Sequence, residues 1–78
     1  MNKNELREVL NREGFDPDSY DLDGGLLPEK YTLSEEAGAW SVYYSERGLQ
    51  TGKRTFATES EACEYFLKEM RDDPTTKA

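Results

Sequence analysis

Histidine is missing from this sequence, cysteine occurs once, and no apolar run approaches the length of a membrane span. Without histidine, the chain lacks the commonest general base and metal ligand of proteins. The single thiol, Cys63, lies among Glu59, Glu61 and Glu64, and these negative charges should raise its pKa. We therefore expect Cys63 to pack as a small apolar residue, and we expect no catalytic residue, no cofactor and no enzymatic activity.

The scarcity of cysteine and of long apolar runs also indicates where in the cell the protein is expected. One cysteine cannot form an internal disulfide, whereas small secreted domains usually carry several. A membrane span needs about 18 apolar residues, and a secretory signal joins a basic start to an apolar middle; the sequence shows neither pattern. The expectation is a cytoplasmic protein without membrane association.

Positive charge is also scarce, with 10 Lys and Arg against 17 Asp and Glu, a net charge of −7 over 78 residues. Residues 1–36 carry −6, residues 37–57 carry +2 and residues 58–78 carry −3. An acidic chain repels phosphates and attracts basic surfaces. Nucleic acid is therefore not an expected partner. The element order outlined below also occurs in double-stranded-RNA-binding domains, but those place basic residues where this chain has an acidic segment.

Helical patterns occupy the two ends of the chain. The first predicted helix spans about 4–13, capped by Asn2 or Asn4 and ended by Gly14. The second begins at Thr58, which forms a capping box with Glu61. Its predicted buried stripe consists of Ala62, Cys63, Phe66, Leu67 and Met70. We expect a single domain over 1–71 and a flexible C-terminal tail over 72–78.

The middle of the chain has the period of two that is typical of strands. One predicted strand starts at Tyr31, a second spans 40–45 and a third ends near Phe56, with glycine-containing turns between them. A further short strand at 20–22 is left open. The sequence thus predicts an α+β fold: a helix, a three- or four-stranded antiparallel meander and a helix, with both helices on one face of the sheet. Tyr31, Leu33, Trp40, Val42, Tyr44 and Phe56 should face the helices.

The aspartate-rich segment is a candidate for calcium binding. Ser19, Asp21, Asp23 and Gly24 align with positions 1, 3, 5 and 6 of a calcium loop. The first position should be aspartate, however, and the twelfth is Lys30 where a bidentate glutamate is needed. Turn-forming aspartates explain the segment better, and no metal is expected.

Five residues are candidates for binding a partner. Tyr43 has the parity of the sheet face opposite the helices, which is expected to be open, and Arg47 follows in the next turn; Tyr and Arg are enriched at interface anchors. Asp18, Asp21 and Asp23 form an acidic segment that should attract a basic partner and speed association. A cross-strand pair at an exposed sheet face is an equally good account of Tyr43.

The chain contains two distinctive strings, Trp40-Ser41-Val42-Tyr43-Tyr44-Ser45-Glu46-Arg47-Gly48 and Ser60-Glu61-Ala62-Cys63. They are the most specific part of a likeness over nearly the whole chain, which resembles small bacterial proteins that accompany polymorphic toxins and are regarded as immunity proteins. The resemblance implies a protein that binds and neutralises a cognate toxin domain, such as a basic nuclease. The alternative is a structural or adaptor module that homodimerises through the open sheet face around Tyr43.

Overall fold

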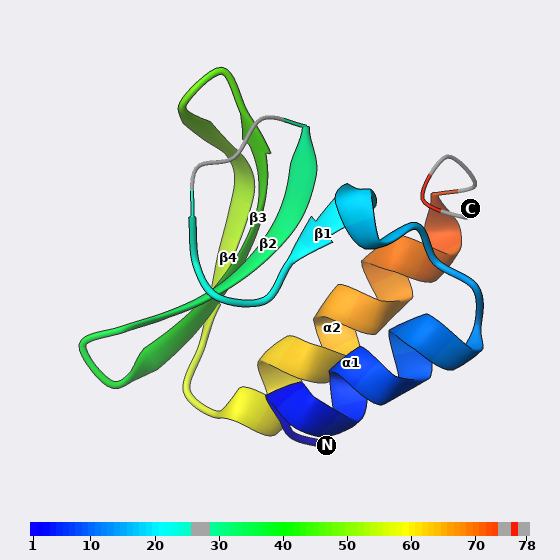
Figure 1. Cartoon of the computed structure of the whole chain (residues 1–78). Helices are drawn as coiled ribbons and strands as arrows, with labels where there is room; N and C mark the ends of the chain where they lie inside the picture. Colours follow the sequence, from blue (N-terminus) through cyan, green and yellow to red (C-terminus); the bar gives the residue numbers. More distant parts are fainter. Residues whose placement is uncertain (26–28, 74–75, 77–78) are drawn as a thin grey trace.

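The computed structural model describes residues 1–25, 29–73 and 76 (Figure 1). Its elements follow the order helix, strands, helix, with a short 3₁₀ turn before the first strand. They are α1 (Lys3–Arg12), η1 (Pro17–Ser19), β1 (Tyr20–Asp21), β2 (Lys30–Glu36), β3 (Ala39–Glu46), β4 (Leu49–Phe56) and α2 (Glu59–Asp72). The α+β prediction is confirmed.

The four strands form one mixed sheet in the order β1-β2-β3-β4. Strands β2, β3 and β4 are the antiparallel meander that the sequence predicts. The prediction of an entirely antiparallel sheet is wrong at β1, which pairs parallel to β2 through Tyr20 and Tyr31. The chain does not turn directly from β1 into β2, because residues 22–29 lie between the two strands. A hairpin would have reversed its direction.

Two tight turns fix the register of the meander. Ala37 and Gly38 join β2 to β3, and Arg47 and Gly48 join β3 to β4. All four have positive φ, at 52° and 81° in the first turn and 50° and 79° in the second. Positive φ at both central residues defines the type I′ turn, whose backbone twist matches the twist of the two strands that it joins. Both turns agree with the sequence-based prediction.

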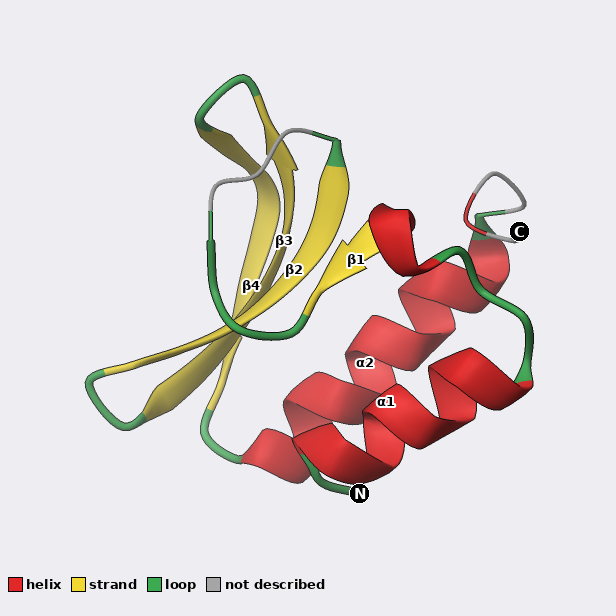
Figure 2. Ribbon diagram, viewed as in Figure 1, coloured by secondary structure: helices red, strands yellow, loops and turns green. Residues whose placement is uncertain are grey.

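The core lies where the helices meet the sheet. Helix α1 packs against α2, and α2 contacts β2, β3 and β4 (Figure 2). Leu6 and Leu10 of α1 join Leu33 and Val42 of the sheet in one buried cluster. All five residues of the predicted stripe on α2 belong to this cluster, and Tyr31, Trp40 and Phe56 pack against it. That both helices cover a single face of the sheet stays a prediction.

The ends of the helices show how local sequence sets their boundaries. Asn2 caps α1 in a capping box with Glu5, so of the two predicted caps the earlier is used. Gly14 follows α1 at a φ of 79°, a conformation that favours glycine. Thr58 caps α2 by accepting a hydrogen bond from the Glu61 amide at 3.2 Å. The Glu61 carboxylate accepts from the Thr58 hydroxyl at 3.0 Å, which differs from the predicted capping box.

The C-terminal segment is described in part. Asp72 belongs to α2, and Thr76 is 2% exposed. The Thr76 hydroxyl donates to the Met70 carbonyl at 2.8 Å, and its own carbonyl accepts from the Asp16 amide at 2.8 Å. Residues 74–75 and 77–78 lie outside the described residues, so the predicted tail over 72–78 stays a prediction.

Candidate functional site

The three predicted aspartates lie before, within and after β1, and the contacts of this segment are mainly with its own backbone. Asp16 caps η1 by accepting from the Asp18 amide at 3.0 Å. The Asp18 carbonyl accepts from Lys30 Nζ at 2.6 Å. Asp21 Oδ1 accepts from the Asp23 amide at 2.9 Å. The Asp16 and Asp21 contacts are the local side-chain bonds that make aspartate a turn former.

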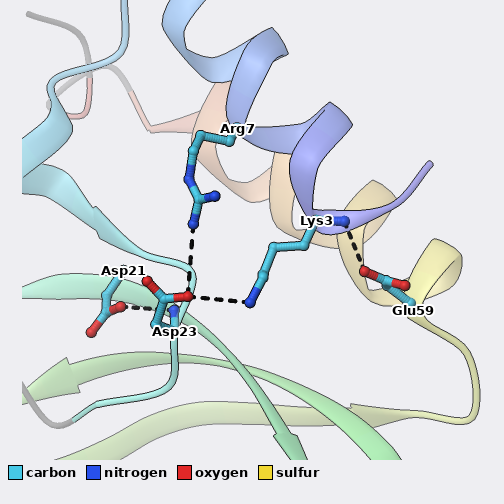
Figure 3. Close-up of polar contacts among 5 residues, drawn as sticks. All are labelled: Lys3, Arg7, Asp21, Asp23 and Glu59. Carbon is cyan, nitrogen blue, oxygen red and sulfur yellow. Dashed lines mark hydrogen bonds and ion pairs between the residues drawn. The ribbon is translucent and has the colours of Figure 1, made fainter.

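Asp23 also binds cations of α1 (Figure 3). Its Oδ1 lies 3.2 Å from Lys3 Nζ and 3.7 Å from an Arg7 guanidinium nitrogen. The Lys3 amide in turn donates to Glu59 Oε2 at 2.8 Å, which ties the start of α1 to the start of α2. The Asp23 side chain remains 72% exposed, so its pairs are of the weak, salt-sensitive kind. Part of the predicted attracting charge is therefore already paired within the chain.

Tyr43 lies on the predicted face of the sheet, but it is buried. Only 3% of the residue is exposed. Its hydroxyl donates to the Gly25 carbonyl at 2.9 Å, and Lys53 Nζ lies 5.9 Å from its ring centroid. Burial raises the pKa of Tyr43, and the nearby Glu36 adds to the effect. The ring of Tyr43 is therefore not presented to a partner.

The expectation that this sheet face is open is wrong over β2 and β3. Its residues Thr32, Ser34, Ser41, Tyr43 and Ser45 are all buried. The segment after β1 lies against the face: a Cβ added to Gly24, whose φ is 67°, would lie 2.8 Å from Ser34 Oγ. Sequence parity identifies the face correctly. It does not reveal that a segment ten residues earlier in the chain covers it.

Arg47 occupies the exposed β3–β4 turn with a φ of 50°. Asp21 lies near enough to Tyr43 to act on it electrostatically. Within the described ranges, no hydrogen bond or ion pair links Arg47 to Tyr43 or to the three aspartates. The structure therefore does not assemble the five predicted residues into one site.

Cys63 is fully buried in α2. Burial raises its pKa to about 11, and Glu59 adds to the shift. The direction of this shift agrees with the sequence-based expectation. A thiol that stays protonated is a poor nucleophile, so Cys63 belongs to the core.

A more coherent site lies between the sheet and the C-terminal half of α2. A cavity of about 240 Å³ is lined by Tyr31, Tyr44 and Tyr65 together with Glu69. A second cavity of about 390 Å³ shares Tyr31 and Tyr44 and adds Glu29 and Asp73. We call these two adjoining cavities the tyrosine groove.

Strand register and helix spacing position the side chains of the groove. Tyr31 and Tyr44 are directly paired across β2 and β3, with ring centroids 5.1 Å apart at an interplanar angle of 69°. Edge-to-face pairs of this kind are favourable for aromatic rings. Tyr65 and Glu69 are four residues apart on α2 and thus on the same side of the helix. The register shift between Val42 and Tyr44 bends β4 at the wall formed by Gly52.

Carboxylates give the groove a negative character. Tyr31 donates to Asp73 Oδ2 at 3.0 Å, and burial together with this bond raises the pKa of Tyr31 to about 12. Burial raises the pKa of Tyr44, with contributions from Glu29 and Glu46. The nearby Glu69 carboxylate raises the pKa of Tyr65, and burial adds to the effect. The tyrosines therefore stay neutral at and above neutral pH.

Two cations limit where this negative character is strongest. Arg54 and Lys68 both act on Tyr65 in the opposite direction from Glu69. Among the described residues, no basic side chain contributes to the pKa shift of Tyr31 or Tyr44, where acids and the neighbouring ring act besides burial. The end of the groove lined by Tyr31 and Tyr44 is therefore its acidic end.

The groove is not apparent from the sequence, because the alternation of the strands predicts that Tyr31 and Tyr44 lie in the core. Both are half-buried, which leaves part of each ring at the surface. The residue type did contain a signal, since the hydroxyl group of a buried tyrosine usually forms a hydrogen bond. The position of α2 beside these rings depends on tertiary packing, which the spacing of residues in the sequence does not predict.

The chain matches no family model, no curated protein and no solved structure. Among the helices in the described part of the chain, none has the length and apolar character to cross a membrane.

Proposed function

We propose that this chain is an acidic protein-binding module of the immunity or antitoxin type, which binds and neutralises a basic toxin domain. The observation that carries the proposal is the tyrosine groove, a concave site lined by aromatic rings and bordered by carboxylates. Aromatic residues are enriched at the centres of protein interfaces. A site of this composition suits a basic protein surface.

The charge of the whole molecule supports the same partner. A net charge of −7 attracts a basic domain over a long range and speeds encounter. A nuclease is one such domain, since its site must attract phosphate. Asp18 is exposed and contributes to this attraction, whereas Asp21 is half-buried and Asp23 is already paired with α1. The groove tyrosines take the anchoring role first assigned to Tyr43.

The proposal is tested by capture followed by a neutralisation assay. Immobilised protein is exposed to a lysate of its source cell at low salt, and the bound proteins are eluted with sodium chloride and identified. Each captured protein is then expressed in a host with and without this chain. We expect a basic protein that impairs growth alone and is tolerated when both are present.

Matched variants connect the assay to the groove. Glu69→Gln removes a carboxylate from the tyrosine groove, and Glu64→Gln removes one from the same helix outside it. We expect the first change to weaken protection and the second to leave it intact. Captured proteins that are acidic, or that harm the host equally with and without this chain, would rule out the proposal.

Self-association is the alternative function, and the features of one sheet edge argue for and against it. Strand β4 is an edge of the sheet, and its Leu49 is 66% exposed. The same strand carries Lys53 and Arg54 and a register shift, which are the features that protect sheet edges from pairing. We therefore expect a monomer, and sedimentation equilibrium would detect a dimer.

A further inference from the structure

The geometry points to the guanidinium group of an arginine side chain as the occupant of the acidic end of the tyrosine groove. The inference rests on the proposed function for its biological setting, a basic protein partner. It deepens that function by naming the chemical group that the groove recognises. The residues that carry it are Tyr31, Tyr44, Glu69 and Asp73.

The rings supply the first half of the recognition. A cation is attracted to the face of an aromatic ring, and guanidinium is the more frequent of the protein cations in such contacts. Tyr31 and Tyr44 meet at 69°, so their rings form two walls of a corner and not a closed stack. Both line the two adjoining cavities, of about 240 and 390 Å³. The corner therefore opens into space that a side chain can enter.

The carboxylates supply the second half. Glu69 lines one cavity and Asp73 lines the other, and Tyr31 and Tyr44 line both, so a cation beside these two rings has carboxylates near it. Glu69 acts on the nearby Tyr65, but an ionised carboxylate has about four acceptor positions. It can therefore also accept from the N–H groups of a guanidinium. Charge-assisted bonds of this kind are stronger than neutral ones.

Planarity favours arginine over lysine. A guanidinium can stack its face on a ring while its edge donates to a carboxylate, and it is less strongly hydrated than an ammonium group. An ammonium group offers only a compact charge. Neighbouring acids Glu29 and Glu46 add negative potential at Tyr44, which favours either cation over a neutral group but does not distinguish between them.

The test uses three small probes: ethylguanidinium, ethylammonium and the neutral, planar N-ethylurea. Each is titrated into the intact chain carrying ¹³C-labelled tyrosine, at constant chloride, and the ring signals are followed by NMR. We expect saturable shifts of the Tyr31 and Tyr44 signals with ethylguanidinium, weaker binding of ethylammonium and no saturable shift with N-ethylurea. Circular dichroism at each final concentration confirms that the chain stays folded.

Variants then assign the binding to the groove. Tyr44→Leu keeps an apolar side chain but removes the ring, and should weaken ethylguanidinium binding about fivefold. Glu69→Gln keeps the shape and removes the charge, and should weaken it about threefold. Glu64→Gln should leave the affinity unchanged.

Three results would overturn the inference: equal shifts with N-ethylurea, ethylammonium binding as tight as ethylguanidinium, or unchanged affinity in Glu69→Gln. The probes contain no protein, so their failure would not touch the neutralising function. Conversely, a groove that binds ethylguanidinium while the capture assay yields no basic partner would contradict the proposed function alone.

Discussion

At the scale of single residues, the tyrosines differ in what their hydroxyl groups touch. Tyr43 donates to a backbone carbonyl and closes one face of the sheet. Tyr31 donates to the Asp73 carboxylate and, together with Tyr65 of α2, borders a cavity. The same residue type thus stabilises the fold at one site and forms a candidate contact surface at another.

Substitution of Tyr43 should test its structural role. Tyr43→Phe removes only the bond to the Gly25 carbonyl and should lower the free energy of unfolding by about 1 kcal/mol. Tyr43→Ala removes a buried ring and should cost about 3–5 kcal/mol, enough to unfold a domain this small. Urea denaturation measures both. If Tyr43→Ala proved as stable as the wild type, the ring would not be needed to close this face.

Arg47 should be an unfavourable residue in the β3–β4 turn and should lower the free energy of unfolding. Its φ of 50° is unfavourable for most side chains, whereas asparagine before glycine is preferred in a type I′ turn. Arg47→Asn should therefore raise the free energy of unfolding by about 0.5–1 kcal/mol. Arg47→Ala serves as the control, because it removes the same charge without the conformational benefit, and it should not stabilise. Equal stabilisation by both changes would assign the effect to charge.

At the scale of elements, α2 holds the fold together because its stripe meets both α1 and the sheet. Phe66 is fully buried in the cluster, and Phe66→Ala should cost about 3–5 kcal/mol. Thr58→Ala removes only the cap and should cost about 1 kcal/mol. Thermal melts of the two variants should differ clearly in midpoint. Equally mild effects would show that Phe66 is not central to the core.

Local elements could be predicted from sequence, and non-local ones could not. Caps such as Asn2 and Thr58, and the turns at Ala37 and Arg47, depend on neighbouring residues and were predicted. The parallel pairing of β1 depends on the path of the chain between two strands, which carries no periodic signal. Burial of Tyr43 and opening of the tyrosine groove both depend on which segment lies over which face. Alternation gives the side of a strand, not what covers it.

At the scale of the whole molecule, the surplus of negative charge and the raised tyrosine pKa values make the free energy of unfolding depend on pH in the alkaline range. Folding raises the pKa of Tyr31 from 10.0 to about 12 and that of Cys63 from 9.0 to about 11. Between these values the folded state keeps protons that the unfolded state has lost. Stability is therefore fully present below the unfolded pKa and falls as pH rises toward the folded pKa.

Urea denaturation at a series of alkaline pH values measures this loss. The free energy of unfolding should begin to fall above pH 9.0 through Cys63 and fall more steeply above pH 10.0 through Tyr31. Cys63→Ala should flatten the first part of the profile and Tyr31→Phe the second. A profile that stayed level to pH 11 in the wild type would contradict the burial described for both groups.

The central claim is that this acidic chain binds a basic protein through the tyrosine groove. Chemical-shift mapping of the isotope-labelled chain with the partner obtained by capture tests it most directly. The account predicts perturbations centred on Tyr31, Tyr44 and Glu69, reduced by Glu69→Gln and unaffected by Glu64→Gln. Perturbations centred on the outer face of α1 or on residues 16–23, with the groove signals unchanged, would contradict it.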